Sequence, residues 1–143
     1  MKRTVVFLIP ILLLAFLGTP SAKTQGFKVI VNSRSDVSSL SKREVSRLFL
    51  KKVKMWDNDL KVIPVDLPSN EEAREMFSRE IHGKSVSAIE AYWQQRVFSG
   101  RDVPPPEKRS DASVIDFVRE NPGAIGYVSE NANVRGVKVI EVE

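Results

Sequence analysis

Polar side chains that suit an anion site follow the apolar segment 62–65, where it runs into a predicted helix. Ser69 and Asn70 stand at the expected start of this helix, and Arg74 lies about one turn further on. The first N–H groups of a helix lack partners within it, and its aligned peptide dipoles place partial positive charge there. Anions bind readily at such a position. We therefore take Ser69, Asn70 and Arg74, together with Arg34 in the loop after the first predicted strand, as candidate ligands of a small anion.

Each of these candidates also suits an ordinary structural role. Ser69 is followed three residues later by Glu72, which is the capping-box pattern of a helix start. Asn70 is typical of turns, and Arg34 and Arg74 suit positions that face solvent. The sequence leaves the ligand role and the structural role open for all four residues.

The residues that most catalytic sites require are missing from the sequence. The chain has no Cys, a single His (His82) and no Gly-x-Ser-x-Gly motif, so only carboxylate chemistry remains. Glu71 and Glu72 are adjacent and would project about 100° apart on a helix, a poor geometry for a general acid–base pair. His82 has no neighbours at metal-ligand spacing and suits a helix end. We expect a protein that is not an enzyme and that holds no cofactor and no metal.

Residues 1–22 have the pattern of a secretory signal peptide. Lys2 and Arg3 precede an apolar run at residues 5–17, and small residues close the segment. A membrane anchor is the alternative, but a spanning helix needs about 20 apolar residues and this run is shorter. We expect the mature domain, residues 23–143, to lie in the periplasm without spanning a membrane.

The length of 143 residues suits one domain with its own core, and the net charge is +4. Without the two basic residues of the predicted leader, 20 basic residues face 18 acidic ones, so the mature chain is nearly balanced. Lys42, Arg43, Lys51 and Lys52 form a basic cluster that would suit nucleic acid in a cytosolic protein. Export removes that partner, and a solvated surface is the other interpretation. We expect no binding to nucleic acid.

Apolar periodicity and turn residues predict an α/β domain, with helices flanking a mixed sheet. The expected strands are Phe27–Asn32, Ala124–Ser129 and Val137–Val142, with a hairpin at 53–65. The expected helices are one at 42–50 capped by Ser41 and Glu44, one from Ser69 to Gly83, one capped by Ser87 that ends at Gly100, and one capped by Ser110 or Asp111. A stiff proline-containing connection is expected at 101–109.

The two tryptophans are expected to be buried rather than to bind a ligand. Trp56 suits the edge of the core, with a role as a binding aromatic as the alternative. Tyr92, Trp93 and Val97 recur at helical spacing with Ile89 and form the apolar stripe of the third predicted helix. The stripe predicts that these four side chains pack inwards.

Several segments occur in the same order as in a known family. They are 29–32, 37–41, 48–50, Trp56, Glu75, Phe77 and 122–128, the last of which reads Pro-Gly-Ala-Ile-Gly-Tyr-Val. Together they resemble the solute-binding proteins of phosphate ABC transporters. Those proteins are type II periplasmic binding proteins, in which two α/β lobes joined by a hinge close over the anion. The resemblance implies that this chain is a single, non-catalytic lobe that corresponds to the second of the two.

The turn that binds the anion in that family has different residues in this sequence. The family's turn runs Arg-x-Asp/Glu-Gly-Ser-Gly-Thr, with the Arg, Ser and Thr among the ligands. Counted back from Phe77, the Arg position is Leu67, the Ser position is Glu71 and the Thr position is Ala73. Because carboxylates repel phosphate and already occupy the helix start, the resemblance implies a degenerate phosphate-binding turn.

The resemblance implies two kinds of function. The first is an exported solute-binding domain that takes phosphate or another small anion weakly, with an ABC permease as partner or as a homodimer that rebuilds two lobes. The second is an envelope protein-interaction module that keeps the lobe as a scaffold, since a fold does not fix a function.

Overall fold

The strand β1 (Phe27–Asn32) is the centre of the structure, a computed structural model that describes residues 26–143. β1 lies between β4 (Ala124–Ser129) and β5 (Val137–Val142) and pairs antiparallel with both. All three strands have the bounds that the sequence predicts. The predicted signal peptide, residues 1–22, lies outside the described residues.

Two short strands complete the sheet. β2 (Ser39–Leu40) pairs parallel with β5, and β3 (Ile63–Pro64) pairs parallel with β4, which gives the order β2-β5-β1-β4-β3. The predicted hairpin at 53–65 forms only in part, since a single antiparallel bridge between Met55 and Lys61 joins its two arms. The sheet is mixed, as predicted.

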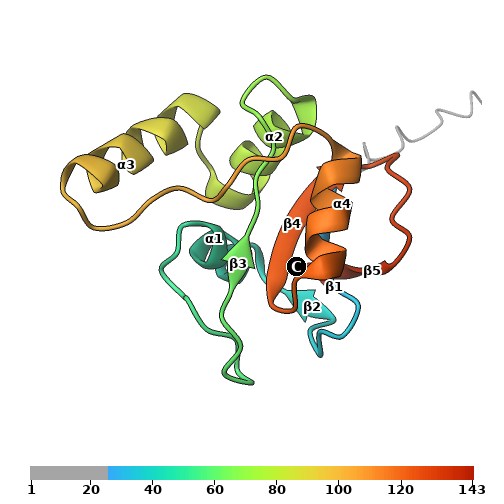
Figure 1. Cartoon of the computed structure of the whole chain (residues 1–143). Helices are drawn as coiled ribbons and strands as arrows, with labels where there is room; N and C mark the ends of the chain where they lie inside the picture. Colours follow the sequence, from blue (N-terminus) through green and yellow to red (C-terminus); the bar gives the residue numbers. More distant parts are fainter. Residues whose placement is uncertain (1–25) are drawn as a thin grey trace, which may run out of the picture.

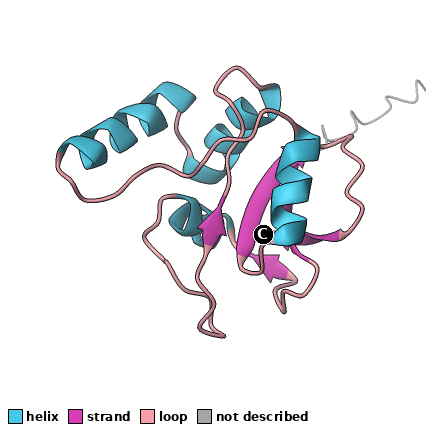
Figure 2. Cartoon of the chain, in the orientation of Figure 1, coloured by secondary structure: helices cyan, strands magenta, loops and turns pink. Residues whose placement is uncertain are grey.

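Helices cover both faces of this sheet (Figures 1 and 2). They are α1 (Lys42–Phe49), α2 (Glu72–Phe77), which continues into the π-helix η1 (Ser78–His82), α3 (Val86–Phe98) and α4 (Asp111–Glu120). α4 packs on β4, where Gly126 lies close to Val114. The next residue of β4, Tyr127, points to the opposite face and contacts Phe49 of α1 and Phe77 of α2. The α/β prediction is confirmed.

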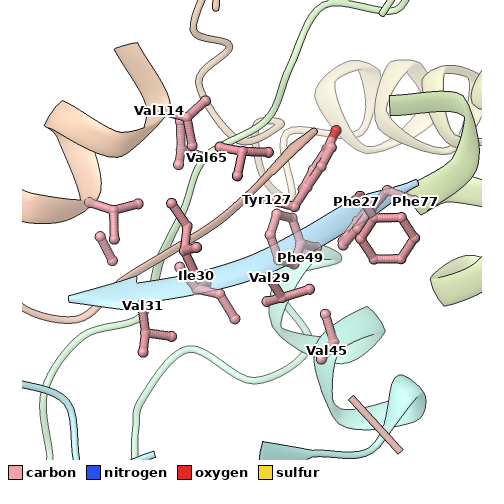
Figure 3. Close-up of a cluster of buried hydrophobic side chains, with 14 of the residues drawn as sticks. Phe27, Val29, Ile30, Val31, Val45, Phe49, Val65, Phe77, Val114 and Tyr127 are labelled. Carbon is pink, nitrogen blue, oxygen red and sulfur yellow. The ribbon is translucent and has the colours of Figure 1, made fainter. Parts of the chain in front are cut away.

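An aromatic cluster holds α2 against the sheet (Figure 3). The rings of Phe77 and Tyr127 stack with their centroids 3.9 Å apart, and the rings of Phe27 and Phe49 lie 5.5 and 4.7 Å from that of Phe77. Buried aromatic rings contribute large apolar areas and prefer such specific geometries. The cluster therefore anchors the C-terminal end of α2, the helix that contains Arg74 and follows Ser69 and Asn70.

Two of the predicted helix caps are wrong. Ser69 does not cap α2, because residues 68–71 first form a turn in which the Glu71 N–H donates to the Pro68 carbonyl (3.1 Å), and Glu71 becomes the N-cap without a side-chain bond. α3 is capped by Ser85, whose hydroxyl accepts from the Ala88 N–H (3.2 Å), and not by Ser87. The capping box predicted at the start of α1 is present.

The corrected caps predict a clear difference between two serine variants. Ser85→Ala removes a cap and should lower the free energy of unfolding by about 1 kcal/mol. Ser69→Ala removes no cap and, as an exposed turn substitution, should change that free energy by less than about 0.5 kcal/mol. Urea unfolding of the two variants beside the parent chain measures both values. Equal losses would contradict the cap assignment.

The third helix buries only part of its predicted stripe. Ile89 and Trp93 are buried and Tyr92 is half-buried, but Val97 is 50% exposed. The prediction that Val97 packs inwards is wrong, because α3 projects from the rest of the lobe and its C-terminal end has little to pack against (Figure 1). Within residues 26–143, no helix is long and apolar enough to cross a membrane.

Candidate functional site

The turn between β3 and α2 holds the candidate ligands Ser69 and Asn70, and α2 itself holds a third, Arg74. Ser69 and Asn70 are both exposed at the tip of the turn. Arg74 is 4% exposed and lies inside the protein. The structure thus brings Ser69 and Asn70 together at the surface, while the prediction that Arg74 faces solvent is wrong.

Arg74 belongs to a buried ionic network. Its Nη1 lies 2.6 Å from Oδ1 of Asp66 and donates to the Leu67 carbonyl at 2.9 Å. The hydroxyl of Tyr127 donates a short hydrogen bond to the same Oδ1 of Asp66. The carboxylate is therefore shared by a guanidinium and a phenol, and the charge of Arg74 is matched within the protein.

The pKa values reflect this network. Burial raises the pKa of Asp66, while the charge of Arg74 and the hydroxyl of Tyr127 oppose the rise. Burial alone would lower the pKa of Arg74, but the Asp66 carboxylate keeps it above its ordinary value. Burial, followed by the charge of Asp66, raises the pKa of Tyr127 far above that of a free phenol. Tyr127 is consequently a permanent donor and Arg74 a permanent cation.

Carboxylates flank the exposed part of the turn. Glu71 is the N-cap residue of α2 and Glu72 begins the helix, directly after Ser69 and Asn70. The position of the family's arginine is Leu67, which is buried in the core. An anion at Ser69 and Asn70 would therefore meet two negative charges, and the guanidinium of Arg74, the candidate ligand in α2, is already paired with Asp66.

Arg34 lies in a different part of the molecule. It is exposed in the loop after β1 and lines a hollow of about 730 Å³, whose lining also includes Arg47, Trp56 and Gly123. The indole Nε1 of Trp56 donates to the Gly123 carbonyl (2.9 Å), which holds the half-buried ring at the edge of the core, as predicted. Arg34 and Arg74 thus line separate hollows and do not form one ligand set.

The sequence interpretation overlooked Asp66 and Tyr127 as a pair. Each carried a signal, since Asp66 directly follows an apolar strand and Tyr127 stands in a fully apolar one. A buried carboxylate or phenol needs a hydrogen-bond partner. What the sequence lacked was any sign that residues so far apart in the chain meet.

His82 ends the π-helix η1 and has a protein-internal role. Its Nδ1 lies 2.8 Å from the Ser46 hydroxyl, and its ring packs edge-on against Phe77 at 5.5 Å. Burial, with smaller effects from the charges of Arg74 and Lys52, lowers the pKa of His82 to about 4. No three His, Asp or Glu side chains within residues 26–143 gather to hold a metal ion.

The lowered pKa of His82 predicts a loss of stability in mild acid. Above pH 6.5, the pKa of His82 in the unfolded chain, the imidazole is neutral in both the folded and the unfolded chain. Below that pH the unfolded chain binds a proton at His82, whereas the folded chain does not bind it until about pH 4. The free energy of unfolding should fall by about 1 to 2 kcal/mol between pH 7.5 and pH 5 through this group. Urea unfolding of the parent chain and of His82→Asn at both pH values measures the effect, and an identical pH slope in the two proteins would contradict it.

Comparison with known proteins places the fold. No protein-family model and no curated protein matches the chain. Solved structures do match: an ABC-type phosphate transport receptor from Vibrio cholerae (18% identity, TM-score 0.62) and PstS from Borrelia burgdorferi (14%, 0.58). A third, a phosphate ABC transporter substrate-binding protein structure from Clostridium perfringens with bound phosphate, has 18% identity and a TM-score of 0.61. Each match covers 82% of this chain.

The chain has the fold of a single lobe of a periplasmic binding protein. It spans 46%, 47% and 44% of the Vibrio, Borrelia and Clostridium chains respectively, which is less than half of each. At these identities the likeness concerns the fold alone. The bound phosphate belongs to the Clostridium structure and the transport role to the Vibrio receptor, and the shared fold does not transfer either to this lobe.

Proposed function

We propose that this lobe is an exported, non-catalytic binding domain whose phosphate-binding turn is degenerate and which acts by docking to another protein of the cell envelope. The observation that carries the proposal is the buried pair of Asp66 and Arg74, 2.6 Å apart. Because Asp66 pairs with Arg74, the guanidinium of this candidate ligand is not free to bind phosphate. Glu71 and Glu72 add repulsion at the same place.

The exposure of the turn supports the same conclusion, because Ser69 and Asn70 lie at the surface of the lobe. An anion held there keeps a face in water, where charge-assisted hydrogen bonds are weaker than in a closed cleft. A protein partner can dock on such an exposed surface instead.

Weak solute binding is the second candidate, and the phosphate present in the Clostridium structure favours it. In this version, exposed Ser69 and Asn70 contact a small anion at the turn, and an ABC permease or a second copy of the lobe completes the site. In this version, Arg34 and Arg74 do not contact the anion. Glu71 and Glu72 keep this binding weak.

Cross-linking in intact cells tests the docking function. A tagged full-length chain is expressed, treated with a membrane-permeant cross-linker and purified under denaturing conditions. We expect one discrete cross-linked envelope protein, identified by mass spectrometry and absent when the tag alone is exported. A chain that stays monomeric and uncross-linked, yet saturates with a small solute in vitro, would contradict the proposal.

A further inference from the structure

The helix α3 forms a small structural unit beside the main core. Its buried side chains, Ile89 and Trp93 (3% and 5% exposed), lie outside the main hydrophobic cluster. Lys51 and Lys54 are close to Asp102, at 3.7 and 2.8 Å, and so fasten the connection that follows α3. The helix thus projects from the lobe, and the connection after its C-terminal end is held by these ion pairs (Figure 1).

A groove of about 480 Å³ runs between α3 and this connection. Its apolar lining comes from Trp93, Val97 and Phe98 on the helix and from Pro104 and Pro105 on the connection. We call these five residues, with Glu90 and Glu107, the α3 groove.

The end of the α3 groove carries apolar surface that nothing in the described chain covers. Phe98 is 95% exposed and Val97 50%, and Val103 beyond them is 60% exposed. A partner that covers Phe98 removes its ring from water and so gains binding energy. Adjacent exposed apolar side chains with a polar rim are typical of interaction sites.

The charges of the groove favour a basic partner. Glu90 and Glu107 are exposed among the lining residues, whereas Asp66 and Arg74 at the base neutralise each other. The groove is therefore acidic, although the whole chain carries a net charge of +4.

Four cations on α3 and on nearby segments contact groups outside the α3 groove. Arg96 lies over the ring of Tyr92 at 5.1 Å, and Lys108 lies over that of Phe117 at 4.8 Å. Lys51 and Lys54 are held by Asp102. None of these side chains lines the groove, so its acidic character stands.

The prolines limit how a partner can bind. Pro104 and Pro105 have no N–H groups, and the backbone of Asp66 already pairs with Pro106 and Lys108. An added β-strand would find few free backbone donors at this edge. Recognition must then rest on side chains: apolar ones against Trp93 and Phe98, and basic ones beside Glu90 and Glu107.

We propose that the α3 groove docks a peptide segment of an envelope protein in which basic and apolar side chains alternate. This inference rests on the proposed docking function and names its surface and the chemistry of its partner. A Lys or Arg of the segment pairs with Glu90 or Glu107 and passes over the face of Phe98, where a cation–π contact adds to the attraction. An anionic surface is disfavoured by the same two carboxylates.

Fluorescence anisotropy with a labelled peptide of alternating lysine and leucine tests the chemistry. The parent chain should bind this peptide, but not the counterparts in which glutamate replaces lysine or serine replaces leucine. Phe98→Ser should weaken binding about tenfold, and Glu90→Lys with Glu107→Lys by at least as much. Glu120→Lys with Glu141→Lys, which makes the same change of net charge away from the groove, should leave binding within about twofold.

The outcomes separate the α3 groove from the docking function. Three results would contradict peptide docking at the α3 groove. They are no binding, equal binding of the lysine and glutamate peptides, and binding that Phe98→Ser leaves unchanged. Sedimentation of the parent chain as a dimer that Phe98→Ser converts to a monomer would also overturn it, because the occupant is then a second copy. If the parent chain and Phe98→Ser cross-link equally to one envelope protein in cells, the proposed docking function is retained. The proposal that the α3 groove is the docking surface is then wrong.

Discussion

Arg74→Met should lower the free energy of unfolding by about 3 to 5 kcal/mol, because it leaves the Asp66 carboxylate buried without its cation. Met fills similar space, so lost packing contributes little to this loss. Asp66→Asn should also be strongly destabilising, since it leaves the guanidinium of Arg74 buried without an anion. Chemical unfolding of each variant at pH 7.5 measures both losses.

The double variant Asp66→Asn with Arg74→Met provides the control for this prediction. If the two side chains form one buried pair, the double variant should be less destabilised than the sum of the single losses, with a coupling of about 1 to 3 kcal/mol. Arg79→Met offers a matched exposed case, because Arg79 pairs with Glu75 at the surface at 2.6 Å and should lose under about 1 kcal/mol. Additive losses at Asp66 and Arg74 would contradict the pairing.

Gly123→Ala should cost about 3 kcal/mol, the second large effect. Gly123 has φ of +85°, where a side chain is strained by about 1 to 2 kcal/mol. A Cβ there would also lie 2.3 Å from the Lys61 carbonyl oxygen, which is backbone and must move. This displacement would disturb the pairing of β3 with β4, because the Ile63 N–H donates to the Gly123 carbonyl at 3.0 Å.

Gly100→Ala separates the two causes. Gly100 has a similar φ of +66°, but nothing lies within 4 Å of the position of its Cβ. It should therefore lose only the backbone contribution, about 1 kcal/mol. Thermal or urea unfolding of both variants gives the comparison, and equal losses would show that the contact with Lys61 is unimportant.

The strands were readable from the sequence because their signals are local. β1, β4 and β5 are apolar segments bounded by Gly, Asn or Ser, and their predicted bounds are confirmed. β3 is a two-residue strand within its longer apolar run, although the Val65 N–H beyond it still donates to the Ile125 carbonyl at 2.9 Å. The start of α2 was misplaced because a turn closed on Pro68 precedes the helix, and Ser–x–x–Glu spacing does not reveal such a turn.

The chemistry of the site was less readable than the fold. Arg74 has the spacing of a helix residue near a ligand, yet it pairs with Asp66, whose carboxylate also accepts from Tyr127, through contacts formed only in the folded chain. Val97 has the spacing of a core residue, yet α3 projects, so its end stays exposed. Sequence spacing indicates which face a residue lies on but does not indicate what that face meets.

Calorimetric titration of residues 23–143 with phosphate, in a phosphate-free buffer near pH 7.5, tests the central claim most directly. If Asp66 neutralises Arg74, and if Glu71 and Glu72 repel phosphate at the turn, no saturable heat should appear up to about 1 mM phosphate. Saturable binding with a Kd in the micromolar range or below, abolished in Ser69→Ala with Asn70→Ala, would contradict the claim and make the lobe a phosphate-binding domain.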